Sequence, residues 1–316
     1  MTPLAQGGWG LDALWADDLH HQLRRLTAGD SAGYFAAYEG SVPAVVETLR
    51  RGWTYEGQTR PDTGEARGTP ASGIAPERFV HCIQNHDQVG NRAFGERLNH
   101  QVPLPLYRAV SALLTFSPYT PLLFMGQEWA ASSPFLYFTD HPEELGRLVT
   151  RGRREEFGHF PEFRDEATRE SIPDPQAEET FRRSVIDGEE RGEEPHRGVL
   201  RLYEEMLRLR REEPAMRDPA RENWSVHPLG EAGLALRRRA AGDAGDEDLL
   251  LLVVFAGEIA LLPGMPGWSE ALPSAPWTPV LVTEEARFGG AGGWGRIEGD
   301  GGIHLIGPVA AVLKRG

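Results

Sequence analysis

Several residue types are scarce in this chain of 316 residues, and each scarcity excludes a class of protein. Cys82 is the single cysteine, so the sequence has neither a disulfide framework nor a cysteine metal site. Basic residues are fewer than acidic ones, 33 against 47, and the net charge of −14 argues against a nucleic-acid partner. Lys314 is the only lysine, so nearly all of the positive charge is arginine.

Long apolar runs are also lacking. The longest run, residues 249–256, has the length of a strand and is too short to span a bilayer. The first ten residues have neither the basic nor the apolar region of a signal peptide. The sequence therefore predicts a soluble, cytoplasmic protein with no membrane partner. Hydrophobic residues make up 40% of the chain, which is enough for a real core.

The first two hundred residues alternate between strand-like and helix-like patterns. Short apolar runs predict buried strands that end near Trp15, cover residues 79–83 and begin at residue 120, each with polar residues after it. Helical spacing of apolar residues predicts helices at residues 41–52 and around Val110. The alternation of strand, helix and strand favours a parallel α/β sheet.

After about residue 220 the pattern changes to short strands separated by Gly and Pro. Five strands are predicted, at residues 224–229, 233–239, 249–256, 278–283 and 303–313. They are typical of a small antiparallel β domain, and residues 241–248 predict an acidic hairpin loop within it. Before the change, helices are predicted near residues 142–157, 176–186 and 200–210. The sequence thus predicts two domains, residues 1–219 and 220–316.

The most informative stretch is the strand at residues 79–83 and its continuation, Asn85-His86-Asp87-Gln88. Polar groups at the carboxyl end of a buried parallel strand are where (β/α)8 barrels place their active sites. Asp87 is therefore a candidate catalytic carboxylate. The alternative is a plain turn after a strand, with His86 a structural histidine.

A second polar cluster follows the strand that ends near Trp15, in a predicted loop. It contains two carboxylates and two imidazoles, Asp17, Asp18, His20 and His21. Such groups could ligate zinc or manganese, or could act as acid and base. A purely structural polar loop is the third possibility.

These segments resemble the α-amylase superfamily, glycoside hydrolases built on a (β/α)8 barrel. Asn85-His86-Asp87 is similar to the Asn-His-Asp segment of that superfamily. The continuation from Gln88 to Leu98 resembles malto-oligosyltrehalose trehalohydrolases in particular, and the likeness extends over nearly the whole chain. It implies hydrolysis of the α-1,4-glucosidic bond next to the terminal trehalose of maltooligosyl trehalose. It implies no metal and no cofactor, because glycosidic hydrolysis needs only carboxyl groups and water.

The resemblance also implies roles for residues that match the family. It makes Asp87 the carboxylate that stabilises the oxocarbenium-like transition state, and His86 a donor to substrate hydroxyls. The residues that it places along the sugar-binding cleft are Asn85, His86, Gln88, Arg92, Trp15, Asp17, Asp18, His20, His21, Tyr34 and Tyr55. The three aromatic ones, Trp15, Tyr34 and Tyr55, could stack on sugar rings or could simply pack.

The resemblance covers only the carboxyl-terminal part of the family's pattern. Family members carry a nucleophilic Asp in an Arg-x-Asp context after the fourth barrel strand and an acid Glu after the fifth. Arg60-Pro61-Asp62 has this spacing, but it lies in a long Gly- and Pro-rich loop predicted over residues 52–78. We therefore expect an α/β fold with an incomplete (β/α)8 barrel, about strands six to eight, plus the β domain. Such a chain would lack nucleophile and acid and be inactive alone.

Two partners follow from this expectation: the sugar, either maltooligosyl trehalose or a maltooligosaccharide, and an amino-terminal fragment of the same enzyme. Two other hypotheses stay open. The chain could be a noncatalytic glucan-binding or complementing module. It could also be a reorganised hydrolase that pairs Asp17 or Asp18 with Asp87.

Overall fold

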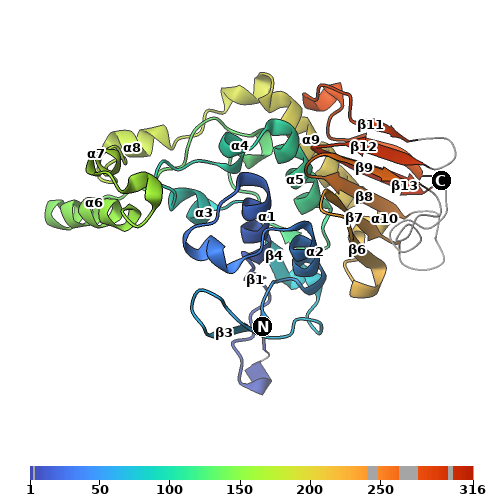
Figure 1. The fold of residues 1–316 in the computed structure, drawn as a ribbon, viewed down its shortest axis with the longest axis horizontal. Coiled ribbons are helices and arrows are strands. Elements are labelled where there is room, and N and C mark those ends of the chain that lie inside the picture. Colours follow the sequence, from blue (N-terminus) through green and yellow to red (C-terminus); the bar gives the residue numbers. More distant parts are fainter. Residues whose placement is uncertain (3, 241–247, 263–276, 298–301, 316) are drawn as a thin grey trace.

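Two regions of different architecture make up the molecule. The computed structural model describes residues 1–2, 4–240, 248–262, 277–297 and 302–315. The amino-terminal region combines short strands with helices, and the carboxyl-terminal region consists mainly of antiparallel strands, drawn in orange and red in Figure 1. Helices α6 (Glu143–Phe157), α7 (Glu166–Glu170) and α8 (Glu178–Arg183) lie at the end of the molecule opposite these strands (Figure 1). No helix among the described residues is long and apolar enough to cross a membrane.

The amino-terminal region contains three parallel strands, as the alternating pattern predicts. They are β1 (Leu14–Trp15), β4 (Phe79–His81) and β5 (Thr120–Pro121), in the order β1-β4-β5. Trp15 lies opposite Val80, and Val80 lies opposite Thr120. The carboxyl ends of the strands therefore meet at one edge of the sheet. β5 is shorter and less buried than predicted, because only its two residues pair with β4 and both are half-buried.

Helices connect and cover these strands. They are α1 (Asp18–Ala28), α2 (Val42–Arg51), α3 (His86–Gly90), α4 (Leu98–Gln101) and α5 (Leu104–Phe116). The prediction for α2 is confirmed at both ends. The Ser41 hydroxyl accepts a hydrogen bond from the Ala44 amide, and Gly52 ends the helix with a φ of 105° that favours glycine.

Two more helices follow the α6–α8 segment, α9 (His196–Glu212) and α10 (Pro214–Arg217). Helix α9 packs on α5, which also contacts the antiparallel sheet. Short 3-10 helices occur at Leu4–Gln6, Gly33–Ala37, Pro76–Arg78, Gln127–Trp129, Pro161–Phe163, Glu189–Gly192, Arg221–Asn223 and Ala286–Phe288.

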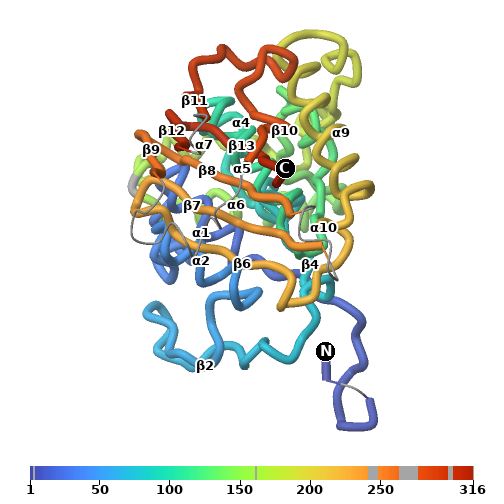
Figure 2. Tube along the Cα trace, turned by 90° about the vertical axis from the view of Figure 1, so that its right-hand side faces the viewer, coloured from blue at the N-terminus to red at the C-terminus, as the bar shows by residue number. Residues whose placement is uncertain are grey.

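The carboxyl-terminal region contains a five-stranded antiparallel sheet with the order β10-β13-β8-β7-β6. Its strands are β6 (Trp224–Leu229), β7 (Gly233–Arg238), β8 (Leu249–Val254), β10 (Trp277–Val282) and β13 (Val309–Arg315). Figure 2 shows this sheet with the helices behind it. A smaller antiparallel sheet of order β11-β12-β9 lies beside it, formed by β9 (Glu258–Leu261), β11 (Gly295–Ile297) and β12 (Ile303–Ile306).

Strand β8 explains why a continuous apolar run occurs in an antiparallel sheet. Leu249, Leu251 and Val253 join the large core that includes α5 and α9. Leu250, Leu252 and Val254 point to the other face and join a second core with the smaller sheet. Side chains alternate between the two faces of a strand, so a strand covered on both faces must be apolar at every position.

Three further sequence predictions differ from the structure. Residues 303–313 form two strands, β12 and β13, because Pro308 has no amide N–H to continue a ladder. The predicted loop at 52–78 contains a hairpin of β2 (Glu56–Thr59) and β3 (Ala66–Gly68). The predicted Asp-Asp-x-His-His loop is the first turn of α1, where Asp18 suits the positive end of the helix dipole. Of the predicted acidic hairpin loop, residues 241–247 lie outside the described residues.

The large core crosses the predicted domain boundary at residues 219 and 220. It includes Leu113 of α5 together with Leu251 of β8 and Val312 of β13. A buried ion pair spans the same junction, with Arg108 of α5 donating to both carboxylate oxygens of Glu284 at 3.0 and 2.6 Å. The division into residues 1–219 and 220–316 stays a prediction.

Candidate functional site

The Asn-His-Asp segment begins a short helix at the end of β4. Asn85 is its cap: the side-chain Oδ1 accepts a hydrogen bond from the Gln88 amide at 2.8 Å. Asn85 itself is buried, whereas His86 and Asp87 in the first turn are exposed. Cys82 lies between β4 and this helix, only 4% exposed, and burial raises the pKa of its thiol to about 12. The local fold thus presents His86 and Asp87 at the carboxyl edge of the parallel sheet.

Asp87 borders a pocket of about 200 Å³. Its Oδ1 accepts a hydrogen bond from the side-chain amide of Asn91, one helical turn further on, at 2.9 Å. The side chains that line the pocket are Asp17, His21, Tyr34, Tyr38, Arg60, Arg67, Asp87, Gln88 and Asn91. The structure therefore brings five of the predicted site residues together.

Gln88 joins the two predicted clusters. Its amide nitrogen donates to Asp17 Oδ2 at 3.1 Å, and its amide oxygen accepts from the Tyr34 hydroxyl at 3.3 Å. The pKa of Asp17 is raised, first by burial and then by the neighbouring negative charges of Asp18 and Asp87. The pocket thus places two carboxylates, Asp17 and Asp87, in one lining with two arginines, Arg60 and Arg67.

Asp18 has a supporting position behind the pocket. It is buried and accepts hydrogen bonds from the Tyr38 hydroxyl at 2.6 Å and the Thr54 amide at 2.7 Å. Arg67 forms an ion pair with it at 3.6 Å. These contacts fix the segment that leads into the β2–β3 hairpin. They also hold Arg67 of β3, which lines the pocket.

The two histidines of α1 are buried and neutral. His20 Nδ1 lies 2.7 Å from the carbonyl oxygen of Ile83, and burial lowers the pKa of His20 well below its usual value. His21 packs against Tyr34 and Tyr38 with ring centroids 5.0 and 4.6 Å away, and burial lowers its pKa to about 4. Within the described part of the chain, no group of three or more His, Cys, Asp and Glu side chains is arranged to hold a metal ion.

Trp15 gives the site an exposed aromatic surface. Its side chain is 53% exposed, and its ring lies edge-on to His86 with centroids 5.8 Å apart. It lies at the carboxyl end of β1, next to the helix that carries Asp87. An exposed indole in this position can cover the apolar face of a sugar ring.

Seven of the twelve predicted site residues do not line this pocket: Asn85, His86, Trp15, Asp18, His20, Tyr55 and Arg92. Tyr55 is buried, donates its hydroxyl proton to the Ala37 carbonyl and lines a neighbouring cavity of about 520 Å³. Arg92 forms ion pairs with Asp30 at 3.3 Å and Glu96 at 3.4 Å. Arg60-Pro61-Asp62 forms the turn of the β2–β3 hairpin, where Arg60 and Asp62 pair.

Four pocket residues were not predicted from the sequence: Tyr38, Arg60, Arg67 and Asn91. Asn91 follows Asp87 by four residues, a spacing that places both on one helix face. The sequence therefore contained a signal from which Asn91 could have been predicted. The two arginines reach the pocket through the hairpin, and no local pattern marks such a long-range approach.

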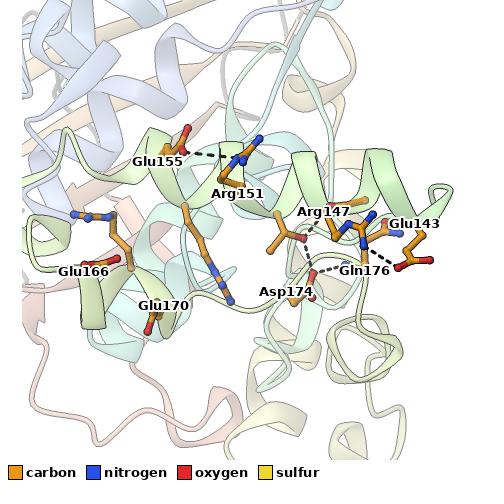
Figure 3. Close-up of a pocket in the computed structure, with 12 residues that line it drawn as sticks. Glu143, Arg147, Arg151, Glu155, Glu166, Glu170, Asp174 and Gln176 are labelled. Atoms are coloured by element: carbon orange, nitrogen blue, oxygen red, sulfur yellow. Dashed lines mark hydrogen bonds and ion pairs between the residues drawn. The ribbon is translucent and has the colours of Figure 1, made fainter.

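A larger pocket lies elsewhere, between α6, α7 and residues 174–176 (Figure 3). Its volume is about 600 Å³, and arginines and acidic side chains pair along it, as Arg147 does with Glu143 at 2.9 Å. The Thr150 hydroxyl donates to Asp174 at 2.6 Å across it. No residue predicted for the site lines this pocket.

Comparisons with known proteins identify relatives of the chain. The chain is 48% identical to a malto-oligosyltrehalose trehalohydrolase of Deinococcus radiodurans over 244 residues, 76% of this chain and 39% of the relative. It is 43% identical to that of Arthrobacter ramosus over 312 residues, 98% of this chain and 48% of the relative. A crystal structure from Salmonella typhimurium described as an α amylase superposes with a TM-score of 0.75 at 31% identity, covering 96% of this chain and 47% of that one. No family model matches the sequence.

The α/β fold and these likenesses define a protein of the α-amylase superfamily of glycoside hydrolases. Within it, the chain belongs to the malto-oligosyltrehalose trehalohydrolase family. The chain spans less than half the length of these two curated relatives, a coverage consistent with their carboxyl-terminal portion.

Proposed function

We propose that this chain is the carboxyl-terminal part of a malto-oligosyltrehalose trehalohydrolase. The reaction is hydrolysis of the α-1,4-glucosidic bond next to the terminal trehalose of maltooligosyl trehalose. Strands β1, β4 and β5 are strands six to eight of a (β/α)8 barrel, and residues 220–316 are its β domain. The protein acts in the cytoplasm.

In this proposal Asp87 stabilises the oxocarbenium-like transition state, and His86 and Trp15 contact the sugar. The observation that carries it is the exposed Asp87, which accepts a hydrogen bond from Asn91 and borders a pocket at the end of a parallel strand. A carboxylate in this place attracts the positive charge that develops on the sugar ring. The relatives named for this reaction, 43% and 48% identical, support the substrate.

The nucleophile and the proton donor come from the polypeptide that matches the rest of the relatives, so the chain alone is inactive. Hydrolysis with retention needs two carboxyl groups about 5–5.5 Å apart across the bond. Asp18 is fully occupied by Tyr38, Thr54 and Arg67, which leaves it unsuited to act as either group. Asp62 lies in the hairpin turn and pairs with Arg60.

The test is trehalose release from maltooligosyl trehalose by two proteins. One is the chain alone; the other is the chain fused behind the amino-terminal part of the Deinococcus radiodurans relative. We expect release by the fusion only, and a loss of roughly 10²–10³-fold in kcat for Asp87→Asn in it.

If the chain alone releases trehalose and Asp87→Asn abolishes this release, the proposal that the chain is an incomplete, inactive barrel is wrong. A fusion that binds maltooligosaccharide but releases no trehalose would favour a noncatalytic glucan-binding module instead. Isothermal titration with maltooligosaccharides separates these outcomes, because binding and hydrolysis are measured independently.

A further inference from the structure

The helix that carries Asp87 is too short to be rigid by itself. Helix α3 has five residues, and isolated helices of this length are unstable in water. The carbonyl groups at a helix end have no partner within the helix. What holds the end of α3 therefore decides how firmly Asp87 is placed.

Asn91, the residue that follows α3, contacts the Asp87 carboxylate. Its backbone amide donates to the Asp87 carbonyl oxygen at 3.0 Å, and its side-chain amide donates to Asp87 Oδ1 at 2.9 Å. Asn91 thus fixes one carboxylate oxygen and leaves the other available. The orientation of the carboxylate follows the orientation of the Asn91 peptide.

Arg153 of α6 holds the backbone carbonyls of Gly90 and Arg92, the residues before and after Asn91. One of its terminal nitrogens, Nη2, donates to the Gly90 carbonyl at 3.0 Å and to the Arg92 carbonyl at 2.8 Å. The side chain is 9% exposed, and its guanidinium lies 4.6 Å from the ring centroid of Tyr137 and 5.2 Å from that of Phe157. This cation caps the end of α3 from an element more than fifty residues away in the sequence.

We propose that Arg153 and Asn91 are positioning residues for Asp87, with Arg153 acting through Asn91. The inference rests on the function proposed for Asp87 in catalysis. Arg153 fixes the two carbonyls, the carbonyls fix the Asn91 peptide, and the Asn91 side chain fixes Asp87 Oδ1. Helix α6 thereby helps to set the geometry of a site in which none of its own side chains takes part.

A lysine cannot replace Arg153 in this arrangement. The planar guanidinium stacks on ring faces while its N–H groups donate in its own plane, whereas an ammonium is a compact, strongly hydrated charge. Arg153→Lys therefore keeps the positive charge but removes the planar group that contacts the rings and both carbonyls together. Arg151, on the same helix but 67% exposed and paired loosely with Glu155, offers a matched control as Arg151→Lys.

The first readout is the side-chain amide signal of Asn91 in nuclear magnetic resonance spectra of the chain. Asp87→Asn removes the carboxylate acceptor and defines the change in chemical shift that loss of the contact produces. We expect Arg153→Lys to move the signal in the direction of that change and Arg151→Lys to leave it in place, with thermal unfolding confirming that all variants fold. A signal that Arg153→Lys leaves in place would overturn the proposal.

The second readout is kinetic and uses the fusion described above. Arg153→Lys and Asn91→Ala should each lower kcat about tenfold to a hundredfold, because a displacement near 1 Å can cost that much, with KM little changed. The double variant should be no slower than the slower single variant, because both act through one contact. If the losses in kcat of the two single variants multiply in the double variant, Arg153 acts independently of Asn91, which contradicts the proposal.

The two proposals fail in different ways. If Asp87→Asn leaves kcat unchanged, the proposed role of Asp87 is wrong, while the Asn91 signal still shows whether Arg153 holds the carboxylate. If Asp87→Asn is inactive and Arg153→Lys matches Arg151→Lys in both readouts, only the positioning role is wrong.

Discussion

The parallel and antiparallel sheets differ in length, burial and use. Strands β1, β4 and β5 have two or three residues each, and Trp15 at the end of β1 is half exposed. Strands β8 and β13 have six and seven residues, and every residue of β8 is buried. The candidate site lies at the end of the short sheet, whereas the long sheet contains the longer strands and a strand that is buried at every residue. The comparison indicates that the strands that carry the site are not the ones that bury the most residues.

Helix α5 connects the two regions. It leads directly towards β5 in the sequence, and it packs on α9 and on strands β8 and β13. Its Arg108 pairs with Glu284 beside the antiparallel sheet. The position of β5, and with it one edge of the parallel sheet, therefore depends on the antiparallel region.

The largest expected effect tests this connection. Glu284→Ala leaves the buried Arg108 guanidinium without its carboxylate and should lower the free energy of unfolding by about 3–5 kcal/mol. Denaturant unfolding measures the loss. Arg108→Met combined with Glu284→Leu should recover most of it, because an apolar pair leaves no unpaired charge. A loss of under about 1 kcal/mol in Glu284→Ala, the value of an exposed pair, would contradict the burial.

The second prediction compares the same truncation in the two sheets. Leu251→Ala removes a fully buried side chain from β8 and should cost about 2–5 kcal/mol. Leu14→Ala in β1 removes a half-buried side chain and should cost about 1 kcal/mol or less. Urea unfolding of both variants gives the two values. Equal losses would mean that the short sheet contributes as much as the long one.

The smallest expected effect is the change in the free energy of unfolding with pH that comes from His81 in the parallel sheet. Burial of His81 in β4 lowers its pKa from 6.5 to about 4. The unfolded chain therefore binds a proton on His81 below about pH 6.5, whereas the folded chain stays neutral there down to about pH 4. Stability present at higher pH is lost as the pH falls through this window, by an amount on the order of 1–3 kcal/mol.

His81→Phe removes this titration and should flatten the pH dependence measured by denaturant unfolding. The exposed His141 supplies the control, because His141→Gln should leave the slope unchanged. If His81→Phe leaves the free energy of unfolding as dependent on pH as in the unaltered protein, the effect belongs to other groups. His20 and His21 are such groups, because burial also lowers their pKa values.

The sequence predicted those parts of the fold that depend on neighbouring residues. The capping residue Ser41 and the terminal Gly52 fixed α2 almost to the residue, and the apolar run at 249–256 located β8. The sequence predicts a loop at Asp17, Asp18, His20 and His21, because these residues are polar. The burial of this segment against Tyr34, Tyr38 and Ile83, which allows a helix there, is a tertiary property.

The candidate site could be predicted only in part for the same reason. Asp87 and Gln88 follow directly from the strand and its polar end, and Asn91 was accessible from helical spacing. Arg67 reaches the pocket through a hairpin, and Arg153 contacts Gly90 from a helix more than fifty residues later. Such contacts depend on how distant elements pack, which local patterns do not encode.

Cys82 gives this chain a built-in reporter of local opening. As the only thiol, it lies between β4 and the helix of Asp87, and in the folded protein it is covered and protonated. An alkylating reagent can modify it only when that strand detaches. The modification rate, followed by mass spectrometry, would therefore report how often the segment between β4 and α3 opens and exposes Cys82.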